Sequence, residues 1–219
     1  MRRLYKTGFE VRVIHWSGMN RRIFAHFKKN DPLLYSYIKR VNLPERSLPK
    51  DLFVDLCDAI ISQQLSGKAA ATIFTRFQNL FPKKRVTAHG LLSLSDSKIR
   101  SCGTSNAKVA SLKDLAKKVG NKELDLERLR TLPDEEVMQE LVKVKGIGPW
   151  TAEMFLMFSL GREDVFSHGD LGLRNAIKKI YGFKKEPTRG QIEKIVNSWS
   201  PYRSYACRVL WHSLTLPEK

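Results

Sequence analysis

Residues 143–155 read KVKGIGPWTAEMF, and this stretch decides the fold. A helical apolar pattern over 133–144 ends in it, and a second pattern over 149–160 begins in it. Gly146 and Gly148 flank a single isoleucine, and Pro149 stands where proline is favoured, at the first position of a helix. The stretch therefore predicts a helix–hairpin–helix with its hairpin at 143–150.

A tight hairpin of this kind exposes backbone N–H groups at the start of its second helix. Unpaired donors and the helix dipole attract a phosphate there. Glycine suits such a turn because a Cβ would hold a DNA backbone away. We therefore expect a phosphate-binding hairpin formed by Lys145, Gly146, Ile147 and Gly148. The alternative is an ordinary pair of helices joined by a glycine-rich corner, which these residues also fit.

The rest of the chain shows helical periodicity and almost no strand alternation. Gly, Pro, Ser and Asn mark short connections between the periodic segments. We expect helices at 31–41, 52–64, 67–81, 96–102, 107–119, 133–144, 149–160, 171–181, 191–199 and 201–214. The sequence predicts an all-α protein with two helical lobes around a DNA-binding cleft. A basic N-terminal arm at 1–30 precedes the helical domain at 31–219.

Composition points to a polyanionic partner. Lys and Arg number 39 against 22 Asp and Glu, which gives a formal charge of +17 on 219 residues. Such an excess favours nucleic acid, with an acidic membrane surface as the second candidate. No apolar run reaches the roughly 20 residues of a membrane-spanning helix, so we expect a soluble intracellular protein. The three cysteines have no metal or disulfide spacing, and we expect buried thiols.

The positive charge is concentrated at the N-terminus. Residues 1–40 hold ten Lys or Arg and only two acidic residues. A mitochondrial presequence has this composition, but Trp16, Phe24 and Phe27 also suit a basic arm packed on the domain. We favour the arm, and with it a nuclear location if the organism is eukaryotic.

An aspartate follows the second hairpin helix. Asp170, in DVFSHGDLGLRNAI, stands at the mouth of the helix expected at 171–181, where a lone Asp is usually an N-cap. Hairpin, helix and aspartate together resemble the helix–hairpin–helix DNA glycosylase superfamily. Three segments resemble its alkylbase, or 3-methyladenine, branch in the same order: AIISQQLSGKAA, GIGPWTAEMF and SWSPYRSYACRVLW. The resemblance covers residues 31–211.

The resemblance implies base excision, in which an alkylated base is flipped out of the duplex and its N-glycosidic bond is hydrolysed. Asp170 would be the catalytic residue, since its charge stabilises an oxocarbenium-like transition state and it orients a water. The positions that match the family's base pocket are Trp150, Met154, Leu171 and Trp211. Aromatic rings there attract a positively charged alkylated purine. For both tryptophans the alternative is burial in the core.

A flipped base leaves a gap in the duplex, and in the family a side chain between the first two core helices fills it. That position is Leu65, with Gln64 and Ser66 at the minor groove. An apolar wedge of this kind unstacks and kinks DNA. The alternative is a buried contact between helices, but the polar neighbours of Leu65 favour the wedge.

Lyase members of the superfamily carry a lysine directly before the Thr-Ala of the hairpin helix, whereas this chain has Trp150 there. The resemblance therefore implies a monofunctional enzyme without lyase activity. It requires no cofactor. Family hairpins often hold a monovalent cation, Na or K, on backbone carbonyls, which here would be those of Val142, Val144 and Ile147.

Several residues depart from the family pattern and leave three functions open. Met154 and Leu171 replace tyrosines of a bacterial member, Gly169 replaces a second acid, and Ser66 stands where an active eukaryotic homologue has histidine. The open functions are a glycosylase, a weak or inactive homologue that recognises and bends abasic-site DNA, and a general helix–hairpin–helix DNA binder. In each case the partner is double-stranded DNA, for the first two with alkylated or abasic sites, and we expect a monomer.

Overall fold

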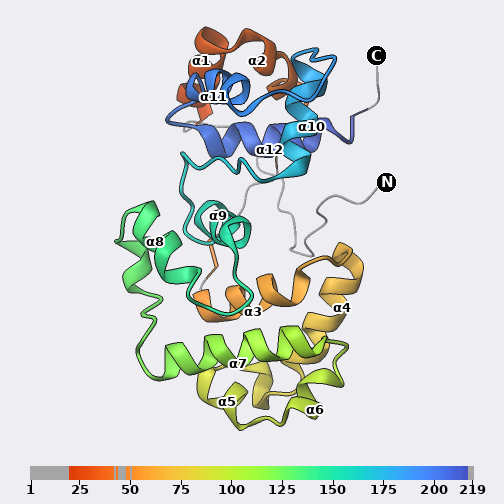
Figure 1. Cartoon of the computed structure of the whole chain (residues 1–219), viewed down its shortest axis with the longest axis vertical. Coiled ribbons are helices and arrows are strands. Elements are labelled where there is room, and N and C mark those ends of the chain that lie inside the picture. The colour runs from red at the N-terminus through yellow and green to blue at the C-terminus, as the bar shows by residue number, and fades with distance from the viewer. Residues whose placement is uncertain (1–19, 42, 44–47, 50, 217–219) are drawn as a thin grey trace. The chain divides into compact units, whose positions relative to one another are not determined.

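The computed structural model describes residues 20–41, 43, 48–49 and 51–216, and every regular element among them is a helix (Figure 1). This confirms the all-α prediction. Residues 1–19, most of the predicted basic arm, lie outside the described part. The described chain divides into two compact units. Unit 1 comprises 48–160, and unit 2 comprises 20–43 and 161–216.

Unit 1 carries the hairpin. Its elements are α3 (Leu52–Ser62), α4 (Gly67–Gln78), η1 (Pro82–Lys84), α5 (Ala88–Ser93), α6 (Asp96–Arg100), α7 (Asn106–Gly120), η2 (Arg128–Arg130), α8 (Asp134–Leu141) and α9 (Pro149–Phe158). Helix α7 packs against α3, α5 and α6 (Figure 1). Apolar residues of α3 and α7, among them Leu56, Ile60 and Leu112, are fully buried. Burial of these stripes holds the unit together.

Polar residues before the helices of unit 1 explain where the helices begin. The side chains of Asp51, Ser66, Thr87, Ser95 and Ser105 each accept a hydrogen bond from a backbone amide in the first turn of the helix that follows. Such caps satisfy amides that have no partner inside the helix. The start of each of these helices is therefore determined by the residue directly before it.

Unit 2 contains α1 (Asn20–Asn30), α2 (Pro32–Ile38), α10 (Leu171–Ile180), α11 (Arg189–Asn197) and α12 (Arg203–Ser213). Asp31 is a buried polar centre of this unit. One carboxylate oxygen accepts the Leu34 amide at 2.9 Å, and the other accepts Trp199 Nε1 at 2.7 Å and the Tyr181 hydroxyl. These bonds tie the start of α2 to the segments that follow α10 and α11.

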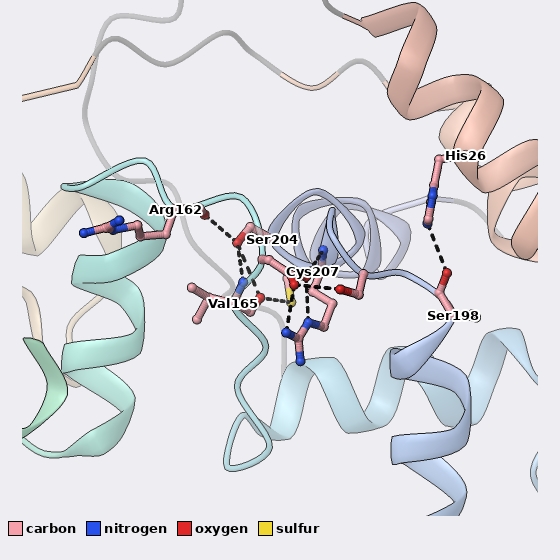
Figure 2. A network of polar contacts seen from close by, with 9 residues as sticks. His26, Arg162, Val165, Ser198, Ser204 and Cys207 are labelled. Carbon is pink, nitrogen blue, oxygen red and sulfur yellow. Dashed lines mark hydrogen bonds and ion pairs between the residues drawn. The ribbon is translucent and has the colours of Figure 1, made fainter. Parts of the chain in front are cut away.

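A polar network fastens the segment before α10 to α12 (Figure 2). Ser204 Oγ donates to the Arg162 carbonyl at 2.7 Å and accepts the Val165 amide at 3.0 Å. Asp164 accepts hydrogen bonds from Arg203 Nε at 2.7 Å and Nη2 at 2.9 Å. Residues 162–165 are thereby held on α12, and this segment leads directly into the loop that carries Asp170.

The ten predicted helices are all present, with ends shifted by a few residues. Helices α1 and α5 were not predicted. Helix α5 is short and contains Gly90, and α1 lies in the stretch assigned to the arm. Ile23 and Phe27 of α1 are buried, and α1 packs on α2. In the described part of the chain, no helix has the length and apolar character needed to cross a bilayer.

Candidate active site and DNA interface

The two hairpin glycines meet different requirements. Gly146 has a φ of 80°, in the left-handed region, and Ser111 Oγ occupies the space that a Cβ would need. Both facts require glycine at this position. Gly148 has an ordinary φ of −95°, and no described atom lies within 4 Å of a Cβ built on it. No close neighbour and no unusual φ therefore requires glycine at 148, although glycine is a favoured residue at the N-cap of α9, the position that it occupies.

The amides of the hairpin are not equally available. The Lys145 amide donates to Asp114 Oδ2 at 2.8 Å, and the Ile147 amide donates to the Val144 carbonyl at 3.0 Å. The amides of Gly146 and Gly148 have no acceptor among the described residues, and both glycines are exposed. The predicted set of four thus offers two amides to a phosphate, together with the exposed side chain of Lys145.

The corner between α3 and α4 consists of residues 63–66. Gln64 has a φ of 58°, which is uncommon for a residue other than glycine, and it is exposed. Leu65 is 37% exposed and is therefore not the buried helix contact that was the alternative to a wedge. Ser66 is the N-cap of α4, and its Oγ accepts the Ala69 amide at 3.4 Å. The corner presents an apolar side chain between polar ones.

Asp170 is 3% exposed and caps α10. Its Oδ1 accepts the Leu173 amide at 2.8 Å and Trp211 Nε1 of α12 at 3.1 Å. Asp170 is therefore an N-cap, as a lone aspartate was expected to be, and it also contacts a predicted pocket residue. Trp211 itself is buried, at 8% exposure.

Gly172 makes this contact possible. A Cβ at Gly172 would lie 3.0 Å from Asp170 Oδ1 and 3.3 Å from Trp211 Cδ1, closer than a side chain tolerates without movement. The missing side chain lets the indole reach the carboxylate. No pattern in the sequence singled out Gly172, because a glycine in a helix becomes informative only when its neighbours in space are known.

The remaining predicted pocket residues fall in both units. Leu171, next to Asp170 in unit 2, is 58% exposed. Trp150 and Met154 are partly exposed and belong to α9 in unit 1, where their spacing of four places them on one face of the helix. Within unit 2, Trp211 contacts Asp170, and Leu171 follows Asp170 in the chain. Within unit 1, Trp150 and Met154 share one face of α9.

The chain is similar to known proteins over most of its length. Residues 57–201 match the model of the HhH-GPD superfamily base excision DNA repair protein family. DNA-3-methyladenine glycosylase 1 of Schizosaccharomyces pombe is 33% identical, and the match covers 97% of this chain and 90% of that protein. The match with the family model spans the α3–α4 corner, the hairpin and Asp170.

Solved structures share the fold. The DNA-3-methyladenine glycosidase of Bacillus halodurans matches with a TM-score of 0.79 and 31% identity over 93% of both chains. The S. pombe 3-methyladenine DNA glycosylase Mag1, solved in complex with abasic DNA, matches with a TM-score of 0.77 and 32% identity over 90% of this chain and 100% of that chain. The chain therefore belongs to the HhH-GPD superfamily of base excision DNA repair proteins.

Proposed function

We propose that this protein is an alkylbase DNA glycosylase that binds damaged duplex DNA, flips an alkylated base out of the helix and hydrolyses its N-glycosidic bond. The family and the names of the relatives support this reaction class. The single observation that carries the proposal is Asp170, a buried carboxylate at a helix N-terminus that also holds the indole of Trp211. An N-cap alone needs neither burial nor an aromatic partner.

Asp170 would act through its charge. The carboxylate is held at the N-terminus of α10 by two N–H groups that donate to its Oδ1, the Leu173 amide and Trp211 Nε1. Cleavage of a glycosidic bond develops positive charge on the sugar, and a fixed carboxylate stabilises that charge more than it stabilises the neutral substrate. Asp170 would also orient the attacking water.

The proposed enzyme is monofunctional. Trp150 directly precedes Thr151 and Ala152 at the start of α9, the position at which lyase members carry their lysine. Without an amine at this place, no Schiff base with the sugar is expected, and the abasic product stays intact.

No cofactor takes part in the proposed reaction, but the hairpin has the donors for a monovalent cation. We propose that the carbonyl oxygens of Val142, Val144 and Ile147 hold Na or K. The three residues lie within six positions of the chain, and backbone carbonyl oxygens suit a hard cation. Such an ion would strengthen phosphate binding at the hairpin.

The proposed partner is double-stranded DNA with alkylated or abasic sites, bound by a monomer, and the proposed location is the nucleus if the organism is eukaryotic. The positive charge of +17 supports a DNA partner. It provides attraction to any duplex, so specificity for damage must come from the corner and the site around Asp170.

Two measurements on the wild type and Asp170→Asn test the proposal: single-turnover release of methylated bases, and affinity for abasic-site DNA. Asparagine is also a good N-cap, so the fold is retained. We expect release to fall by about a hundredfold or more, the scale of losing one electrostatic contact to a transition state. Abasic-site affinity should change by less than about twofold. Equal release by both proteins would leave Asp170 as a cap only.

A second candidate function, abasic-site recognition with little or no excision, is favoured by Ser66. Its short hydroxyl is turned back onto the Ala69 amide of α4, at 3.4 Å, rather than extended from the corner. A wild type that prefers abasic-site DNA but releases no methylated base would establish this second function and overturn the first.

A further inference from the structure

Lys108 of α7 fastens the α3–α4 corner from inside unit 1. Its Nζ donates hydrogen bonds to the carbonyl oxygens of Ile61 at 2.8 Å and Gln63 at 2.9 Å. The last carbonyls of a helix lack partners within the helix and carry partial negative charge, so an ammonium group is well suited to cap them. Burial lowers the pKa of Lys108, as expected for an amine that exchanges water for protein carbonyls.

The same face of α7 also contacts the hairpin. Ser111 and Asp114 follow Lys108 at intervals of three residues, so the three side chains lie on one side of the helix. Asp114 Oδ2 accepts the Lys145 amide at 2.8 Å, and Ser111 Oγ fills the space beside the Cα of Gly146. One helix face therefore supports both DNA-facing segments of unit 1.

Gln63 links the two segments directly. Its side-chain amide donates to the Gly146 carbonyl at 2.9 Å and to Thr151 Oγ1 at 3.2 Å. The first bond joins the corner to the hairpin turn, and the second joins it to the first turn of α9. The backbone of Gln63 is held by Lys108 at the same time, so this residue is fixed from two sides.

We infer that Lys108 and Gln63 are positioning residues that hold Leu65 at a set distance from the phosphate-binding hairpin. The inference rests on the proposed function. A wedge fills the gap of a missing or flipped base only if it enters the duplex in register with the phosphate that the hairpin holds. The corner spans four residues, and Gln64 has an uncommon left-handed backbone, so external bonds must hold it in this conformation.

The test compares Lys108→Met with a matched control on the same helix. Methionine keeps most of the aliphatic stem and removes the ammonium group. Lys113 is the control, because its Nζ donates to the carbonyls of Leu92 at 3.1 Å and Leu94 at 2.5 Å, and so caps α5 as Lys108 caps α3. Lys113→Met therefore removes the same charge and the same kind of cap away from the corner.

Two affinities are measured for each variant by fluorescence anisotropy, one for abasic-site duplex and one for undamaged duplex. For Lys108→Met we expect the abasic-site preference to fall by about tenfold, the scale of one base-stacking contact. Its affinity for undamaged duplex, and the preference of Lys113→Met, should change by less than about twofold. 2-Aminopurine opposite the abasic site should show a smaller fluorescence change with Lys108→Met than with wild type.

A double variant separates positioning from direct contact. If Lys108 acts through Leu65, Lys108→Met combined with Leu65→Ala should show the same preference as Leu65→Ala alone. If the double variant instead loses preference by the product of the two single-variant factors, the inference is overturned. Equal weakening of binding to both duplexes by Lys108→Met would also overturn it, since Lys108 would then be a phosphate contact.

Failure of the proposed function is detected separately. Wild type and Leu65→Ala are measured first, and a wild type with neither abasic-site preference nor base release contradicts the proposed function whatever Lys108 does. If preference is present in wild type, lost in Leu65→Ala and unchanged in Lys108→Met, only the inference fails. Should Lys108→Met not fold, Gln63→Met removes the bond to Gly146 and is tested in the same way.

Discussion

Trp211 Nε1 donates a 3.1 Å hydrogen bond to Asp170 Oδ1, the oxygen that also caps α10 through the Leu173 amide at 2.8 Å. The orientation of this carboxylate is thus set by two helices, α10 and α12. A group held from two directions does not need to reorganise when charge develops beside it. Both groups lie close to Gly172, where a side chain would crowd them.

Gly172→Ala should impair excision without destabilising the protein. The new Cβ would lie 3.0 Å from Asp170 Oδ1 and 3.3 Å from Trp211 Cδ1, so the carboxylate or the indole must shift by a few tenths of an ångström. We expect single-turnover base release to fall by about tenfold, the rate equivalent of roughly 1.4 kcal/mol. Alanine favours helix over glycine by about 1 kcal/mol, which offsets the strain in thermal unfolding.

Gly169→Ala is the control for this prediction, because no described atom lies within 4 Å of a Cβ at 169. Its release rate should match that of wild type. Equal rates for Gly172→Ala and Gly169→Ala would mean that the contact between Trp211 and Asp170 has no part in catalysis.

Substitutions at the two hairpin glycines should change different properties: DNA affinity at Gly148 and stability of the fold at Gly146. The Cβ that Gly148→Ala adds has no described atom within 4 Å. We therefore expect a loss of stability of about 1 kcal/mol or less, because alanine is a poorer N-cap than glycine. Its affinity for damaged and undamaged duplex should fall together, since phosphate contacts carry no sequence or damage information. Gly146→Ala should instead destabilise the fold by about 1–3 kcal/mol, because of its positive φ and the nearby Ser111.

Urea unfolding and anisotropy titrations over a range of salt concentrations check both hairpin variants. Wild type should show a steep salt dependence of duplex binding. Unchanged duplex affinity in a folded Gly148→Ala protein would remove the hairpin turn from the DNA interface.

Leu65→Ala should lower specificity and leave general DNA binding in place. The side chain is 37% exposed, so its removal costs little stability. We expect the preference for abasic-site over undamaged duplex to fall by roughly 1–3 kcal/mol, the scale of a stacking contact. Competition between the two duplexes measures this difference, and an unaltered preference would show that Leu65 does not enter the DNA.

Ser66→His should raise or create release of 3-methyladenine while abasic-site affinity stays the same, because an abasic site has no base to flip. The substitution also removes the Oγ that caps α4, at a cost of about 1 kcal/mol. Ser66→Ala is therefore the control, since it loses the cap and gains no imidazole. If both variants release base at the wild-type rate, slow base release is due to the pocket residues Met154 and Leu171 and not to Ser66.

Asp164 should contribute stability that is lost in acid. Burial raises the pKa of this carboxyl group, but hydrogen bonds from Arg203 and Ser200 outweigh burial and lower it below its usual value. Because the folded pKa lies below the unfolded one, the contribution is complete above the unfolded pKa, near 4, and disappears as pH falls through the folded pKa.

Asp164→Asn should accordingly lower the free energy of unfolding at pH 7 by about 1 kcal/mol or less, the range for a solvent-accessible ion pair. At pH 3 the difference between variant and wild type should be smaller. Urea unfolding at the two pH values measures it, and a difference that does not depend on pH would rule out the ion pair as its source.

The sequence by itself determined the elements that depend on near neighbours. The period of apolar residues predicted ten helices, and the turn of Gly146 and Gly148 before Pro149 predicted the hairpin, because caps, turns and helical stripes are formed by residues a few positions apart. The place of Asp170 before a helix predicted an N-cap for the same reason, whereas its catalytic role came from the resemblance to the glycosylase superfamily. Helix α5 was missed because its six residues include Gly90, which is unfavourable inside a helix.

Only the tertiary structure decided which residues of different elements contact one another. Gln63 meets Gly146 across 83 positions of sequence, Lys108 meets Gln63 across 45, and Trp211 meets Asp170 across 41. No local pattern encodes such pairs, because each depends on how whole helices pack. The space beside Gly172, the filled space beside Gly146 and the open space beside Gly148 are likewise properties of packing. The packing therefore excludes a side chain at Gly146, crowds one at Gly172 and leaves room for one at Gly148.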